Sequence, residues 1–226
     1  VTYSTTPLGI IITEKNVITV CTRGNPVLDE FTDGAVKGVQ TNLKTRFILH
    51  LMLRIATKYL QYLKQIDKLS SHVERELRKS MKNSELIQLL DIEKSLVYFS
   101  SSLKGSEITI EKISRGRVVK LYEEDQDLLE DVLIEVRQAI EMSSIYLNIL
   151  SGTMDAFASV ISNNLNIVMK VLASITLIIS IPTVISSFYG MNVTGLPIAQ
   201  WWFPTIVAII ACIIATIIFI KKDMFH

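Results

Sequence analysis

Two long uncharged apolar runs near the C-terminal end constrain this 226-residue chain more than any other feature. Val171 to Tyr189 and Trp201 to Ile220 contain no charged residue, and each is long enough to cross a bilayer as a helix. A pair of buried helices in a soluble protein is the alternative. Lys170 precedes the first run, Lys221 and Lys222 follow the second, and the segment between them has no Lys or Arg. By the positive-inside rule we expect a membrane hairpin with both ends in the cytosol.

The first run continues a longer helical pattern. From about Leu121 to Tyr189 apolar residues recur at helical spacing, and the stretch holds one glycine, Gly152, and one proline, Pro182. As one helix, its roughly 65 residues would extend about 100 Å at 1.5 Å per residue. We expect a cytosolic stalk helix over 121–169, a first transmembrane helix over 170–189, an outer loop over 190–200, a second transmembrane helix over 201–220 and a basic cytosolic tail over 221–226.

Residues 1–120 have the pattern of the C-terminal part of a cytosolic α+β domain. Pro7 to Thr22 contains two β-branched runs around a turn-like segment at residues 14–16, which predicts a hairpin. A lone hairpin is marginally stable in water, so we expect it to belong to a larger sheet. We therefore expect that the chain begins inside a domain, without a cleavable signal, and that an N-terminal portion is missing.

A pair of helices is expected after the hairpin. The helical pattern runs from about Thr41 to Lys79 and again from Ser84 to Leu103, after a cap signal at Asn83 and Ser84. Gly105 and Gly116 predict a loop before the long helix. The fold class is therefore an α-helical membrane protein that carries the end of an α+β domain.

Composition argues against several function classes. The net charge of +1 gives no reason to expect nucleic acid. Cys21 and Cys212 lie too far apart in sequence to suggest a zinc site or a redox pair. His50, His72 and His226 form no pattern of base, nucleophile or metal ligand, and no glycine-rich phosphate loop is present. We expect neither an enzyme nor an organic cofactor.

Hydroxyl residues recur along one face of the first run at spacings of four, three and four residues. This hydroxyl stripe consists of Thr176, Ser180, Thr183 and Ser187, and the same face continues backward to Leu172, Met169 and, further round, Asn166. Small hydroxyl residues commonly serve close helix packing. The alternative is a pore lining, which requires several copies because a single hairpin cannot enclose water.

Asn192 follows Gly190 and Met191 where the first run should end. Asn tolerates left-handed backbone, so it could be a helix cap. A ring of such residues would instead present several neutral carboxamide oxygens on one axis. Neutral acceptors suit Mg²⁺, which gives up its water shell reluctantly and can be bound through those waters.

At Gly190, Met191 and Asn192 the sequence resembles the CorA family of magnesium channels, whose signature is this Gly-Met-Asn motif at the outer end of the first span. The resemblance extends through "SNNLNIVMKVLASITLIISIPTVISSFYGMN" and the lysines after the second span. The order of hairpin, helical pair and long helix also fits the family. The resemblance covers nearly the whole chain, but the family's first strands and helices have no counterpart in this sequence.

The resemblance implies a homopentamer in the plasma or inner membrane, with the long helix lining a central pore. Asn192 corresponds to the selectivity-filter asparagine, and Gly190 and Met191 support it. The pore-lining positions would be Asn166, Met169, Leu172, Thr176, Ser180, Thr183 and Ser187. Met169 and Leu172 would form a hydrophobic constriction that closes by dewetting.

An acidic cluster from Glu123 to Asp131 is typical of a solvated helix start. In the resembled family, cytosolic Mg²⁺ bridges neighbouring subunits in this region and holds the channel closed. Asp131 aligns with such a position, Asp127 is a neighbour, and Asp155 aligns with a second acidic ring. The loop from Val193 to Gln200 departs from many relatives because it holds no acidic residue, so attraction of cations there should be weak.

The sequence thus predicts a passive Mg²⁺ channel, gated by cytosolic Mg²⁺ and driven by membrane potential, with Co²⁺ and Ni²⁺ as further candidate ions. Its expected partners are its own copies, the lipid bilayer and divalent cations. One alternative is a two-span transporter for zinc or another divalent ion, although the intact Gly-Met-Asn motif argues against zinc. Another is a membrane-anchored coiled-coil scaffold that transports nothing.

Overall fold

The computed structural model describes residues 2–34, 36, 39–116, 118–192, 198, 200 and 202–222. The chain divides into two compact units, Val1–Met154 and Asp155–His226. Both units are built mainly from helices, and one long helix contributes residues to each of them.

The first unit begins with an antiparallel hairpin of β1 (Leu8–Ile12) and β2 (Val17–Cys21), as the sequence predicts. The register pairs Leu8 with Cys21, Ile10 with Thr19, and Ile12 with Val17. The turn closes where the Thr13 N–H donates to the Asn16 carbonyl over 2.9 Å. Within the described residues this sheet has two strands, and the larger sheet stays a prediction.

Two helices lead away from the hairpin. The short α1 (Pro26–Thr32) starts where the Asn25 side chain accepts a hydrogen bond from the Val27 N–H over 3.0 Å. The 37-residue α2 (Lys44–Ser80) matches the helix expected from Thr41 to Lys79. It ends at Met81, whose φ of 49° is left-handed and turns the chain back.

The next helix differs from its sequence prediction at both ends. The N-cap residue of α3 (Asn83–Ser114) is Lys82, and no side chain caps the helix, so the expected cap at Asn83 and Ser84 is wrong. The helix also runs through Gly105, where a loop was expected. Packing explains the difference, because Leu103 and Ile110 on either side of this glycine are each 1% exposed and belong to the core.

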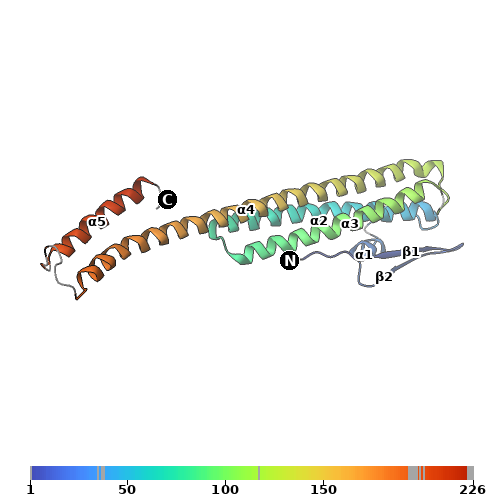
Figure 1. Cartoon of the computed structure of the whole chain (residues 1–226). Coiled ribbons are helices and arrows are strands. Elements are labelled where there is room, and N and C mark those ends of the chain that lie inside the picture. The colour runs from blue at the N-terminus through green and yellow to red at the C-terminus, as the bar shows by residue number, and fades with distance from the viewer. Residues whose placement is uncertain are drawn as a thin grey trace. The chain divides into compact units, whose positions relative to one another are not determined.

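A short 3₁₀ turn, η1 (Glu123–Asp125), precedes the 64-residue α4 (Gln126–Tyr189), which confirms the single long helix. In the first unit the beginning of α4 lies beside α2 and α3 (Figure 1). One core cluster joins the three helices and consists of Leu49, Ala56, Ile110, Leu129, Val132 and Val136. This packing holds the start of α4 in place.

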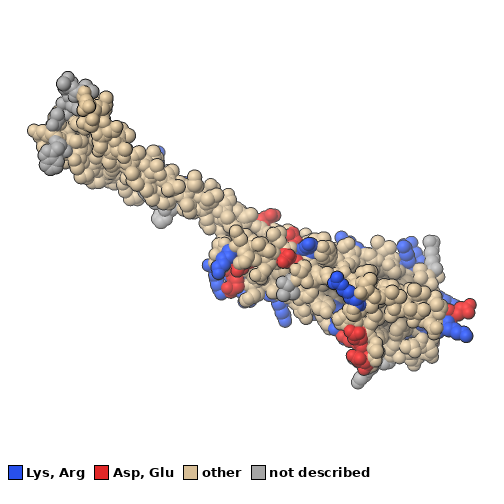
Figure 2. All heavy atoms as spheres, turned by 90° about the horizontal axis from the view of Figure 1, so that it is seen from below, with Lys and Arg blue, Asp and Glu red and all other residues tan. Residues whose placement is uncertain are grey.

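The second unit contains the end of α4 and α5 (Trp202–Lys221). Both helices are long and apolar enough to cross a membrane, and only 6% of the most apolar 18-residue stretch of each is buried within the chain. A buried helical pair of a soluble core would be far less exposed. Figure 2 shows the charged side chains over the first unit, whereas the visible surface of the second is almost uncharged.

Candidate functional site

All four side chains of the hydroxyl stripe are exposed on α4. Three of them donate their hydroxyl proton to a carbonyl of their own helix: Thr176 to Leu172 over 2.8 Å, Ser180 to Leu177 over 2.8 Å, and Thr183 to Ile179 over 3.2 Å. With the proton directed at the backbone, the lone pairs of each oxygen remain able to accept a hydrogen bond. These three side chains therefore form a row of acceptors.

The helix α5 covers a different face of α4. The two helices are antiparallel. The start of α5 contacts the end of α4, where the ring centroids of Phe203 and Tyr189 are 6.1 Å apart. Further along α5, Sγ of Cys212 lies 3.6 Å from the carbonyl oxygen of Ile178, which is earlier in α4. The less exposed residues in this part of α4 are Val171, Ser174, Ile178, Ile181, Pro182, Ile185 and Tyr189. At about 100° per residue their face is nearly opposite the hydroxyl stripe. α5 thus leaves the stripe uncovered.

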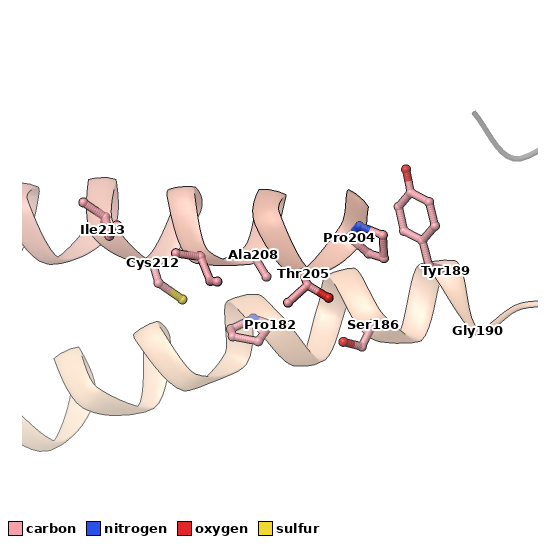
Figure 3. A pocket seen from close by; sticks show the side chains of 10 residues that line it. Pro182, Ser186, Tyr189, Gly190, Pro204, Thr205, Ala208, Cys212 and Ile213 are labelled. Atoms are coloured by element: carbon pink, nitrogen blue, oxygen red, sulfur yellow. The ribbon is translucent and has the colours of Figure 1, made fainter. Parts of the chain in front are cut away.

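An open groove of about 670 Å³ lies between the last turns of α4 and the first half of α5 (Figure 3). Pro182 and Ser186 line it from α4, and Ala208 and Cys212 line it from α5. Ser186 and Ser187 are adjacent in sequence, yet one lines this groove and the other belongs to the stripe.

The other predicted pore-lining residues share the uncovered face. Met169 and Leu172 are each 56% exposed, and Asn166 is also exposed. Two large apolar side chains that lie close together and are more than half exposed can pack against another apolar surface. Their constriction needs further copies of the chain and stays a prediction.

The Gly-Met-Asn motif begins directly where α4 ends at Tyr189. The Gly190 N–H donates to the Ser186 carbonyl over 2.9 Å, and a Cβ at Gly190 would lie 3.1 Å from that oxygen. Glycine therefore permits a close turn at the helix end. Asn192 is exposed just beyond it.

The alternative role of Asn192 as a left-handed helix cap is not supported. Among the described residues other than glycine, positive φ occurs at Met81 and Ile198. The part of the predicted outer loop that has no acidic residue, 193–200, falls largely outside the described residues, since only residues 198 and 200 of it are described. The weak attraction of cations expected there stays a prediction.

The three predicted acidic residues are all exposed on α4. Asp127 and Asp131 are four residues apart and share a helix face, while Asp155 belongs to the second unit. The described part of the chain contains no group of three or more His, Cys, Asp or Glu side chains that could hold a metal ion. A metal site at Asp127, Asp131 and Asp155 stays a prediction.

One member of the acidic cluster has a structural role that its local sequence does not indicate. Asp125 is 5% exposed and its carboxylate lies 3.3 Å from Nε of Arg46 at the start of α2. Arg46 also donates to the Glu124 carbonyl over 3.1 Å. These contacts fix the start of α4 to α2. No local signal distinguishes Asp125 from its solvated neighbours, because its partner lies 79 positions away in sequence.

Comparisons with known proteins all match the same family. The family model described as "CorA-like Mg2+ transporter protein" matches residues 1–222. The Cobalt/magnesium transport protein CorA of Methanocaldococcus jannaschii is 27% identical over 179 residues, which cover 77% of this chain and 56% of that protein. Its counterpart from Thermotoga maritima is 23% identical over 82% of this chain and 54% of its own length. The chain thus spans about half the length of these relatives.

Solved structures show the same fold. The complete structure of the CorA magnesium transporter from Methanocaldococcus jannaschii superposes with a TM-score of 0.74 and 20% sequence identity. The match covers 96% of this chain and 74% of that one. The soluble domain of the same transporter matches 66% of this chain with a TM-score of 0.60.

Proposed function

Because the chain belongs to the family of CorA-like Mg²⁺ transporter proteins, we propose that it forms a channel for hydrated Mg²⁺. The observation that carries the proposal is the uncovered face of α4, where the hydroxyl stripe leads to Gly190, Met191 and Asn192 while α5 packs on the opposite side. Several copies, five by the family resemblance, would bring these faces together around an aqueous axis.

The chemistry of the stripe suits a hydrated cation. Water molecules bound to Mg²⁺ direct their oxygens inward and their hydrogens outward, so the ion's shell seeks hydrogen-bond acceptors. The hydroxyls of Thr176, Ser180 and Thr183 use their protons on helix carbonyls and keep acceptor lone pairs. The carboxamide oxygen of Asn192 offers the same function at the mouth, without a charge that would hold the ion too strongly.

Membrane potential supplies the driving force in this proposal. Moving a divalent ion through 100 mV releases roughly 4.6 kcal/mol, so no nucleotide hydrolysis is needed. Lys170, Lys221 and Lys222 favour a cytosolic location for both ends of the two spans, in a plasma or inner membrane. Met169 and Leu172 would form the constriction near the cytosolic side, and cytosolic Mg²⁺ bound by Asp131 with a neighbouring subunit would favour closure.

Ion flux into liposomes at a controlled voltage tests the proposal. We expect Asn192→Ala to lower Mg²⁺ flux about tenfold, which corresponds to about 1.4 kcal/mol of lost ion stabilisation. Ser187→Ala should also lower the flux, whereas Ser186→Ala, one residue along and on the α5 side, should leave it unchanged.

The same assay separates the alternatives. Wild-type protein that passes no ions would support the scaffold hypothesis, and equal flux through Asn192→Ala would remove the filter role. Zn²⁺ flux that exceeds Mg²⁺ flux in competition would assign the chain to zinc transport instead.

A further inference from the structure

Pro182 interrupts the hydrogen bonding of α4 within its apolar, membrane-length part. In a regular helix the N–H of residue 182 would bond to the carbonyl of Ile178, but proline has no N–H. An unpaired carbonyl is strongly disfavoured in hydrocarbon, since no water is available to it. The Ile178 carbonyl therefore needs a donor from elsewhere.

Three successive carbonyls at this break each accept a hydrogen bond from a side chain. The Leu177 and Ile179 carbonyls accept from hydroxyls of α4 itself, those of Ser180 and Thr183. The Ile178 carbonyl accepts from the thiol of Cys212 on α5, with 3.6 Å between sulfur and oxygen, a normal length for the larger sulfur atom. Figure 3 shows this sulfur pointing from α5 toward α4 beside Pro182.

We propose that Cys212 is a positioning residue, whose thiol replaces the helix hydrogen bond that Pro182 removes and so holds α5 against the break in α4. Ala208, one turn earlier on α5, is 8% exposed, and its small side chain permits the close approach. Thr183 and Ser187 lie beyond the break, so its angle sets the direction of the outer part of the hydroxyl stripe. This last step rests on the proposed channel function, but the contact itself does not.

Infrared spectroscopy of the thiol tests the contact directly. The chain has two cysteines, so Cys21→Ser leaves Cys212 as its single thiol. We expect the S–H stretching band to lie below the frequency of a free thiol, because the group donates a hydrogen bond. Adding Pro182→Ala restores a backbone donor to the Ile178 carbonyl and should shift the band upward. A band at the free-thiol frequency, or one that Pro182→Ala leaves in place, would overturn the proposal.

A double-mutant cycle on the intact chain provides a second test. We expect Cys212→Ala to lower the melting temperature when residue 182 is proline and to have little effect when it is alanine. Cys212→Ser keeps a donor and should retain the stability of the parent. Equal losses from Cys212→Ala in both backgrounds would contradict a link to the proline break.

Flux measurements separate this inference from the proposed function. If the parent conducts Mg²⁺, Cys212→Ala should lower the flux and Cys212→Ser should restore it. Parent-like flux through Cys212→Ala would refute the positioning role in conduction. If the parent passes no ions, the channel proposal fails, while the infrared band and the melting cycle still decide whether the thiol replaces the missing hydrogen bond.

Discussion

Glu30, near the end of α1, lies between two basic side chains of α2. Its carboxylate accepts a hydrogen bond from Nε of Arg54, and its other oxygen is 2.6 Å from Nζ of Lys58. The hydrogen bonds from Arg54 and then Lys58 lower the pKa of Glu30 from 4.5 to about 2. This cluster attaches a helix of seven residues that is too short to be stable alone.

The lowered pKa predicts how stability depends on pH. Above pH 4.5 the carboxylate is ionised in the folded and the unfolded chain, so its full contribution is present. As the pH falls from 4.5 toward 2, the unfolded chain takes up the proton first and the contribution is lost. We expect Glu30→Gln to be less stable than wild type near neutral pH and equally stable at the acid end. Thermal unfolding of both proteins across this pH range measures the difference in stability. A difference that stays constant with pH would contradict the role assigned to the Glu30 carboxylate.

In helix α3, tertiary packing overrides the local preference of a glycine for a loop. Gly105 favours a loop by propensity, yet the helix continues through it and buries apolar residues on both sides. Among the described residues, no atom other than those of the two chain neighbours and the adjoining helix backbone lies within 4 Å of the position that a Cβ on Gly105 would occupy. The glycine is therefore not required by close packing.

Gly105→Ala should stabilise the protein by about 1 kcal/mol, because alanine gains helix propensity at an open position. Gly116 is the matched control, since it also has open space around its Cβ but has a φ of +66°. Gly116→Ala should destabilise by roughly 1–2 kcal/mol, because L-residues are strained in that region. Unfolding in detergent measures both changes, and the same sign for the two variants would refute the argument.

At the scale of the whole molecule, conduction would depend on how several uncovered faces of α4 meet. The proposed constriction predicts that Met169→Gly raises the leak of Mg²⁺ in liposomes, because a narrow apolar ring would widen and admit water. Val168→Gly weakens the same helix next to the stripe and should leave the leak unchanged. An equal leak in both variants would indicate damage to the helix instead of a gate.

The proposed regulation by internal Mg²⁺ would also be a property of the assembly. We expect Asp131→Asn to require more internal Mg²⁺ for closure, because the carboxylate proposed to bridge subunits is lost. Glu130→Gln, an exposed neighbour on α4, should leave the closing concentration unchanged. Flux measured against internal Mg²⁺ tests this, and wild-type sensitivity of Asp131→Asn would favour the solvated-surface interpretation.

Much of the fold could be predicted because its signals are local. The hairpin, the long helix and the two apolar spans follow from periodicity and composition, and the structure confirms these elements. The resemblance carried by Gly190, Met191 and Asn192 is confirmed as family membership over residues 1–222. The loop at Gly105 was wrong because tertiary packing, which no local pattern reports, favours a continuous helix there. The cap at Asn83 and Ser84 was wrong because the N-cap residue is Lys82, which caps the helix with no side-chain hydrogen bond.

Local sequence is enough to place the hydroxyl stripe on one face of an apolar helix, since a repeat of 3.6 residues sets which side chains share a face. The packing of α5 on the other face and the burial of Asp125 against Arg46 are visible only in the folded chain. Folding also brings the Cys212 thiol to the Ile178 carbonyl, which has no backbone donor from Pro182. These contacts join residues distant in the chain, and their partners are chosen by packing and by the need to satisfy buried polar groups.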